Sequence, residues 1–275
     1  MFKSMFTNSF PDEHPVFAHQ LFVQPFSPEL GTYGQRALEL SDYVDEMKTL
    51  RGIHKAAYWA SQDMSDEAVW NCTVHQPLLT CALKTSREVF RSPNVTSAQP
   101  IKQYASLFKG DDHHPKVVDF VVILPGNDTK RRIKNLLHGS EVRTINQTLL
   151  PNMCNRPAFL SIVTRVGHKD EENAKLNLAT WMATWQHQIL RFIKDASCYT
   201  PLPGFFVLGH VWKLYWLFDH QNERQMVEFP YIVGDTRTLA GCYRLIATIR
   251  YLCNVWAWDT FRAWFEGSVL ERNEV

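Results

Sequence analysis

One stretch, residues 117–124 with the sequence VVDFVVIL, constrains the fold more than any other part of the chain. It is rich in β-branched residues, almost wholly apolar and only eight residues long. These features are typical of a central strand that is covered on both faces. A second apolar run, AFLSIVTR at residues 158–165, predicts a partner strand. A sheet buried on both faces needs helices on each side, so the chain should fold as an α/β layer structure.

The remaining pattern supplies those helices and further strands. Apolar residues at helical spacing predict helices over 36–60, 65–83, 129–138, 171–194 and 238–265. We expect Ser65 to cap the second helix, Pro77 to bend it, and Gly267 to follow the end of the last one. Short apolar runs predict strands at 205–210, 212–218 and 227–233. We therefore expect an extended arm at 1–35 and one domain at 36–275, with a helical part at 36–115 and a core at 116–275 around a small mixed sheet.

Charge and hydropathy narrow the possible partners and compartments. The 275 residues include 29 basic and 28 acidic side chains, for a net charge of +1. Proteins that grip nucleic acid through phosphates usually carry a basic excess, so the charge does not indicate a nucleic-acid partner, although it does not exclude one. The run Lys130, Arg131, Arg132 and Lys134 is read as a solvated helix face. Without a signal-like or membrane-spanning apolar segment, we expect an intracellular protein, cytoplasmic or nuclear, without a membrane partner.

A set of segments, none specific alone, resembles in order and spacing a group of fungal proteins of the PD-(D/E)XK nuclease-like superfamily. The similarity runs from about residue 36 to the C-terminus. It rests on EAVWN (67–71), VHQPLL (74–79), VDF (118–120), RP (156–157) leading into SIVTR (161–165), LPG (202–204), GHVW (209–212) and the helix that contains Gly241, Tyr243 and Trp256. The resemblance implies a restriction-endonuclease-like core with a small mixed sheet flanked by helices, preceded here by a helical extension.

In that superfamily, a strand Asp and a Glu-x-Lys on the next strand hold a divalent metal, usually Mg²⁺, and a further helix often supplies another Glu. Side chains at i and i+2 of a strand share a face, so these groups can converge on one ion. Placed on this sequence, the helix Glu corresponds to Glu67 and the strand Asp to Asp119. Val163 stands at the position of the motif Glu, and Arg165 at the position of the Lys.

This departure removes a metal ligand and the group that handles the proton. Valine has no ligand atom, and arginine stays protonated at any working pH. We therefore expect no metal and no cofactor, with Mg²⁺ on the remaining carboxylates as the alternative. We predict that Arg165 pairs with Asp119, with Glu67 as a second candidate partner, at about 6 Å or less, where opposite charges stabilise each other strongly. The alternative is that Arg165 points to solvent at the end of the strand.

Other polar residues complete the candidate site. His210, at the end of a predicted strand, is a candidate general acid or base, with a structural role as the alternative. Thr164, Trp212, His187 and Gln188 are candidates for ligand binding, and at least one residue of 186–188 should face the sheet. The acidic and histidine run at 111–114 is read as a solvated loop, because adjacent loop residues rarely converge on one ion.

Three functions remain open at this stage. The first is a small organic ligand bound in a repurposed cleft, with metal-free isomerase, cyclase or hydrolase chemistry of specialised metabolism as one form of it. There Asp119 or His210 would move protons, and Arg165 would stabilise an oxyanion. The second is a divalent-metal nuclease with ligands relocated to Lys169 and Glu171 or Glu172. The third is a pseudoenzyme that binds without chemistry, which a closed cleft would favour.

Overall fold

The computed structural model describes residues 6–7, 40–84, 89–101, 103–104, 118–168, 171–193, 199–220 and 223–271. The predicted arm at 1–35 lies outside the described residues except for Phe6–Thr7, which form a short strand, β1. The loop at 111–114 and Lys169 also lie outside them. The predicted domain boundaries therefore stay predictions.

A mixed sheet of seven strands forms the centre of the fold. Its order is β1-β6-β5-β4-β3-β2, and β7 pairs with β5. The pair β3 and β4 is parallel, as is β1 and β6, and the other neighbours are antiparallel. The strands after β1 are β2 (Phe120–Ile123), β3 (Ala158–Arg165), β4 (Leu202–Leu208), β5 (Val211–His220), β6 (Glu223–Glu228) and β7 (Gly234–Asp235). The expected α/β class is confirmed, and β3 has the bounds that its sequence predicts.

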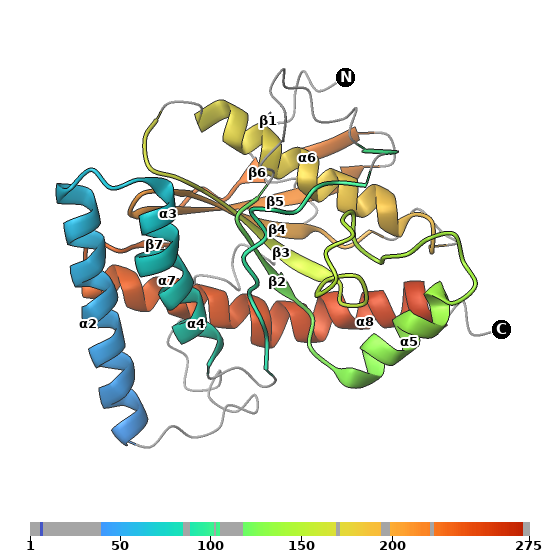
Figure 1. Ribbon diagram of the computed structural model, residues 1–275, viewed down its shortest axis with the longest axis horizontal. Coiled ribbons are helices and arrows are strands. Elements are labelled where there is room, and N and C mark those ends of the chain that lie inside the picture. The colour runs from blue at the N-terminus through green and yellow to red at the C-terminus, as the bar shows by residue number, and fades with distance from the viewer. Residues whose placement is uncertain are drawn as a thin grey trace.

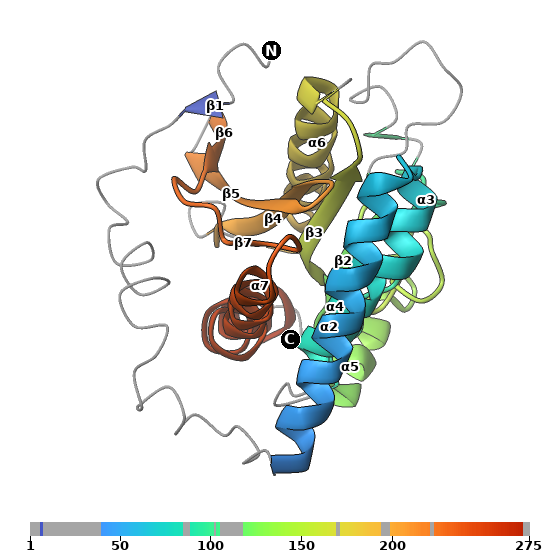
Figure 2. The ribbon, with the colours of Figure 1, turned by 90° about the vertical axis from the view of Figure 1, so that its left-hand side faces the viewer.

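Helices surround this sheet on both faces. They are α2 (Leu40–Gln62), α3 (Glu67–Trp70), the π-helix η2 (Asn71–His75), α4 (Gln76–Leu83), α5 (Asn127–Leu137), α6 (Glu171–Ile189), α7 (Leu239–Tyr251), η4 (Leu252–Phe261), α8 (Arg262–Phe265) and η5 (Glu266–Leu270). Figures 1 and 2 show α6 on one face and the long C-terminal helix, α7 to η5, on the other. The helices α2, α3 and α4 stand beside the strands β2 and β3, and α2 and α4 pack against α7. No helix in the described part of the chain is long and apolar enough to cross a membrane.

The aromatic residues of the chain fill the space between sheet and helices. Phe159 of β3 contacts Trp256 and Phe261 of η4, and Trp185 of α6 also packs on Phe261. All four side chains are 3% exposed or less. Such ring contacts add about 0.5–1.5 kcal/mol each beyond area burial. They tie the C-terminal helix to the sheet that carries the candidate site.

The helix predicted at 65–83 forms, but its cap differs from the prediction. Asp66, not Ser65, is the N-cap, because the Asp66 carboxylate accepts the Val69 N–H at 2.9 Å. A π-helical turn, η2, lies just before Pro77, the residue at which the sequence predicts a bend. Pro77 has no N–H for an ordinary α-helical bond, and the wider turn of η2 leads into α4 with Pro77 in its first turn.

Two further boundaries are corrected. The strand predicted at 227–233 is β6, which ends at Glu228. Pro230 has no N–H to offer a sheet ladder, so the apolar residues that follow it do not extend the strand. The last helix continues through Gly267 to Leu270, and Gly267 lies inside η5. Glycine ends helices when its backbone turns left-handed, and Gly267 does not take a positive φ.

Gly241 of α7 packs tightly against β7. A Cβ atom at this position would lie 2.4 Å from the carbonyl oxygen of Asp235, whereas a Cβ at Gly52 in α2 meets nothing within 4 Å. We expect Gly241→Ala to lower the free energy of unfolding by about 2 kcal/mol through overpacking. The matched control Gly52→Ala should raise it by about 0.5–1 kcal/mol, because alanine favours a helix interior. Urea denaturation of the two variants measures both; equal effects would refute the tight contact.

Candidate functional site

Arg165 lies between two carboxylates at the end of β3. Its Nη1 atom is 3.3 Å from Glu67 Oε2 and 3.8 Å from Asp119 Oδ2. Asp119 is 2% exposed, and the side chains of Arg165 and Glu67 are 18% and 26% exposed. The same guanidinium donates to the carbonyl oxygen of Thr164. The ion pair predicted from the strand spacing is confirmed, with one cation bridging both acids.

Asp119 is built into the backbone of the sheet edge. Its Oδ2 accepts the N–H of Thr164 at 2.7 Å, and its own N–H donates to the carbonyl of Ile162 at 2.9 Å. Its carbonyl oxygen accepts the N–H of Val95 at 2.8 Å. Asp119 stands one residue before β2, not within it. The carboxylate is thus held by a backbone donor as well as by Arg165, which fixes its orientation.

Polar residues on one side of the helix that begins with α3 extend this centre. Glu67, Asn71 and His75 follow one another at intervals of four residues, so they share one side of the helix. The hydroxyl of Thr164 donates to Asn71 Oδ1 at 2.9 Å, and His75 Nδ1 lies 3.0 Å from the same oxygen. Asn71 and His75 are buried and were not among the predicted site residues. Their i, i+4, i+8 spacing from Glu67 is the signal that would have found them.

His75 is fully buried, and that burial lowers its pKa to about 4. The nearby His210 lowers the pKa further, while the contact of His75 Nε2 with the carbonyl of Gly209, at 3.3 Å, opposes the shift. The ring stacks on Trp70 and meets the edge of Trp212. A neutral ring carries one N–H, so at neutral pH it donates to only one of its two oxygen neighbours. His75 is a structural residue between the helix and the sheet.

The predicted residues His210 and Trp212 lie at the far end of the same cluster. His210 Nδ1 is 2.9 Å from Thr236 Oγ1, and its ring stands edge-on to Trp70 with centroids 4.9 Å apart. Burial, reinforced by the charge of Arg237, lowers the pKa of His210. Trp212 is completely buried and packs on Phe205. At this end of the cluster, aromatic rings pack in the core beside the half-buried imidazole of His210.

His187 and Gln188 lie elsewhere on α6. The Gln188 amide donates to the carbonyl of Thr144 and accepts the hydroxyl of Tyr104, both at 2.8 Å. His187 is exposed and meets the ring of Tyr104. Gln186 and Gln188 are buried, and the partners of Gln188 lie outside the strands, so the expectation that one residue of 186–188 faces the sheet stays a prediction. The structure thus brings six of the eight predicted residues into one cluster, and the contacts of His187 and Gln188 lie outside it.

A model of the PD-(D/E)XK nuclease superfamily matches residues 13–262, which is most of the chain. The chain belongs to the PD-(D/E)XK nuclease superfamily. No curated protein and no solved structure matches it significantly. The open mixed sheet with helices on both faces is consistent with the restriction-endonuclease-like fold of this superfamily.

The superfamily implies a divalent metal at this centre, and the residues present do not fit one. Val163 is completely buried and offers no oxygen, and the Arg165 guanidinium lies between the two carboxylates. Within the described residues, no three His, Cys, Asp or Glu side chains come together in a way that could hold an ion. Glu171 and Glu172, the alternative ligands, both pair with Lys175 at 3.0 Å. A cation with hard oxygen ligands lacks its ligand set here.

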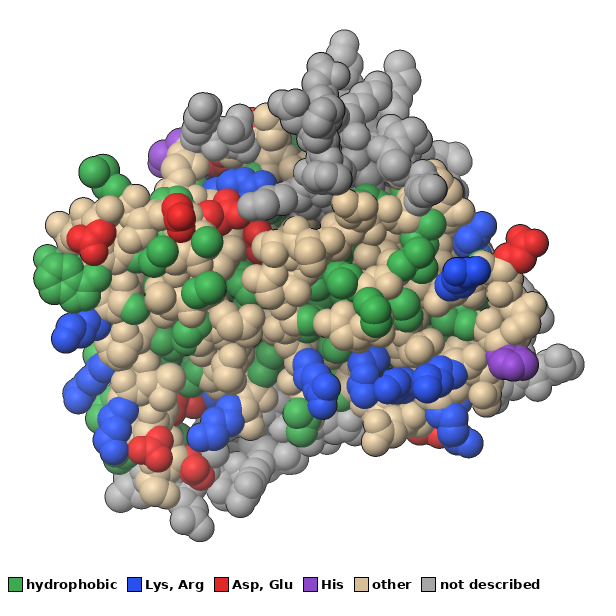
Figure 3. All heavy atoms as spheres, in the orientation of Figure 1, with side chains coloured by type: hydrophobic (Ala, Val, Ile, Leu, Met, Phe, Trp, Pro, Cys, Tyr) green, Lys and Arg blue, Asp and Glu red, His purple; other side chains and the backbone are tan. Residues whose placement is uncertain are grey.

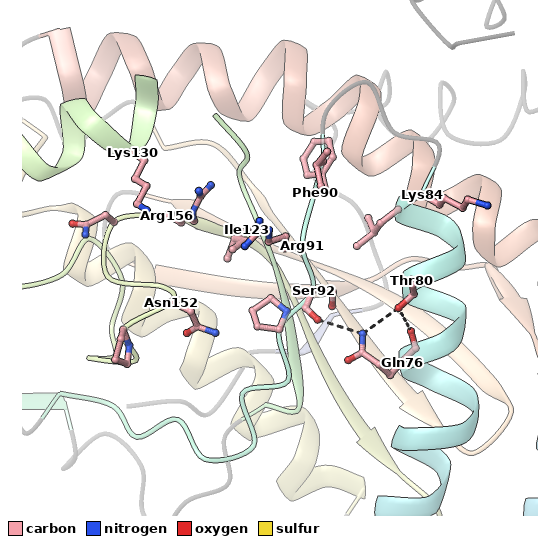
Figure 4. Close-up of a pocket in the computed structure, with 15 residues that line it drawn as sticks. Gln76, Thr80, Lys84, Phe90, Arg91, Ser92, Ile123, Lys130, Asn152 and Arg156 are labelled. Carbon is pink, nitrogen blue, oxygen red and sulfur yellow. Dashed lines mark hydrogen bonds between the residues drawn. The ribbon is translucent and has the colours of Figure 1, made fainter. Parts of the chain in front are cut away.

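A separate cavity of about 700 Å³ opens on another part of the surface. Figure 4 shows it between α4, the segment around Arg91, the end of β2 at Ile123, and α5. None of the eight predicted site residues lines it. This cavity and the charged centre are therefore two different places.

Proposed function

We propose that this superfamily member is a metal-independent binding protein for a small organic ligand and not a metal-dependent nuclease. One observation carries the proposal: Arg165 Nη1 lies 3.3 Å from Glu67 and 3.8 Å from Asp119, where the resemblance would place a metal ion. The guanidinium carries a permanent charge, so it offsets part of the negative charge of the two acids without any bound ion. A divalent cation would have to displace it and then face it at close range.

The burial of the centre supports binding without chemistry over metal-free catalysis there. Asp119 is 2% exposed, and its Oδ2 already accepts the Thr164 N–H and faces Arg165. A general base must reach a substrate proton directly or through one water. Asp119 is therefore proposed as a structural carboxylate, with Arg165 as its fixed counter-ion.

Cleavage and metal-binding assays test this proposal. We expect purified protein with Mg²⁺ or Mn²⁺ to cleave plasmid and single-stranded DNA no faster than Asp119→Asn does. Calorimetry with Mn²⁺ should give no heat of binding for the wild type. The double variant Val163→Glu/Arg165→Lys, which rebuilds the superfamily motif, should gain Mn²⁺ binding provided its circular dichroism is native. Metal-dependent cleavage by the wild type that disappears in Asp119→Asn would disprove the proposal.

A further inference from the structure

The cavity of about 700 Å³ collects basic side chains from separate parts of the chain. Arg91 follows α4, Lys130 lies on α5, and Arg156 precedes β3. In Figure 4 these three side chains lie near one another, and Lys84 of α4 lies across the cavity from them. Figure 3 shows a group of Lys and Arg side chains on this face, near the end of α5. Fifteen residues line the cavity, and none of them is an Asp or Glu.

Arg91, Lys130 and Arg156 make no ion pair within the described part of the chain, in contrast to several other cations. Arg250, for example, pairs with Glu46, and Arg262 lies 2.8 Å from Glu266. Like charges that share a concave surface repel one another, and the low-dielectric walls strengthen the field that they create. A bound anion relieves this repulsion, so the arrangement favours the anion-bound state over the free state.

The rest of the lining combines amide donors with an apolar wall. Asn152 and Asn155 bring side-chain amides to the side that carries Arg156, and Phe90, Leu83 and Ile123 form apolar surface. A volume of this size suits a small organic molecule, for which pockets of about 300–1,000 Å³ are typical. The lining therefore matches a ligand with an anionic end and an organic body.

We propose that this cavity is a binding site for a small organic phosphate, with Arg91, Lys130 and Arg156 as the phosphate-binding residues. Two arginines match the geometry of phosphate oxygens through paired donors, and a lysine adds a compact charge. The inference rests on the proposed function. It specifies the class of ligand, and it places the binding site in this cavity and not at the charged centre. Ile123 at the cavity is four residues along the strand from Asp119, about 13 Å at strand spacing.

A small molecule fits these observations better than a nucleic-acid chain. The cations surround one hollow, whereas backbone-binding proteins usually spread them along a stripe. The net charge of the whole chain is only +1, so no broad field attracts a polyanion. The phosphate group would enter between α5 and the segment of Arg91, with its organic part on the wall of Phe90.

Calorimetry with ATP and pyrophosphate as probes tests the site directly. We expect ATP to bind the wild type with sub-millimolar affinity at physiological salt, more tightly than pyrophosphate, because ATP also covers the apolar wall. Arg91→Gln and Arg156→Gln should each weaken ATP binding by about tenfold or more, as expected for a lost charge-assisted hydrogen bond. The control Lys55→Gln removes the same charge from an exposed position on α2 and should leave ATP binding unchanged. Thermal unfolding verifies that each variant is folded.

Three outcomes would overturn the inference. They are the absence of ATP binding at millimolar concentration, ATP binding that survives the combined Arg91→Gln/Arg156→Gln change, and tighter binding of a 20-base-pair duplex than of ATP. Each leaves the cleavage assay untouched, so failure here is distinguishable from failure of the proposed function. Metal-dependent DNA cleavage would instead refute that function while the ATP titration still reports on the cavity.

Discussion

Replacing Arg165 by methionine is expected to lower the free energy of unfolding by about 3 kcal/mol at pH 7. Methionine keeps the length of the side chain but removes the cation that faces Asp119 and Glu67. Removing one partner of a buried pair costs about 3–5 kcal/mol, and the partial exposure of Arg165 and Glu67 places this variant at the lower end. Urea denaturation of wild type and variant measures the difference.

Two controls separate the charge from the loss of packing. Lys48→Met breaks an exposed pair in which the Lys48 and Asp45 side chains are 69% and 64% exposed, and it should cost less than about 1 kcal/mol. Adding Asp119→Asn to Arg165→Met should recover part of the lost stability, because it removes the most deeply buried carboxylate that lost its counter-ion. The ion-pair account is wrong if Arg165→Met is as mild as Lys48→Met, or if the second substitution gives no recovery.

The second large effect concerns His75 and acid. Burial lowers the pKa of His75 to about 4, below the 6.5 of an unfolded chain. The unfolded state therefore binds a proton more readily, so the stability from a neutral His75 is complete above about pH 6.5 and is lost as the pH falls toward 4. Between pH 7 and 4.5 the wild type should lose roughly 2.5 kcal/mol more than His75→Gln, whose side chain does not titrate.

Chemical denaturation at a series of pH values gives these two curves. His138→Gln provides the control, because His138 is exposed and should leave the acid dependence of the wild type unchanged. Because other groups titrate in both proteins, the difference between wild type and His75→Gln isolates this one ring. Parallel curves for wild type and His75→Gln would show that His75 is not held neutral by burial.

The sequence predicts those parts of the site that follow from strand geometry. Residues 158–165 are all apolar or small except at the end, so the bounds of β3 follow from composition. Arg165 is two positions after Val163, so the two side chains share a face of the strand. The neighbouring strand brings Asp119 beside that face, which places the guanidinium near its carboxylate. The ion pair was therefore accessible from spacing and resemblance together.

The remaining parts depend on distances through space that the sequence does not encode locally. Arg91, Lys130 and Arg156 come from three segments, and only the packing of α5 beside the end of β2 brings them to one cavity. Asn71 and His75 carry a helical spacing, but a buried polar pair has the same pattern as a solvated one until its neighbours are known. Ser65 and Asp66 are adjacent and are both good N-cap residues, so the sequence alone does not decide between them; the structure uses Asp66.

We propose that the pairing of Arg165 with both acids stabilises this centre in place of an ion. The acidic pair would repel if its only partner were water, and Arg165 supplies a charge of fixed position instead. The chain thus keeps the sheet and its flanking helices while the centre acts as a structural tie between α3 and β3.

Anomalous scattering from crystals grown in millimolar Mn²⁺ tests the central claim most directly. The arrangement of Glu67, Asp119 and Arg165 predicts no manganese peak within coordination distance of Asp119, with the guanidinium still between the two acids. A manganese ion bound to the Asp119 carboxylate, with Arg165 turned away from it, would contradict the account.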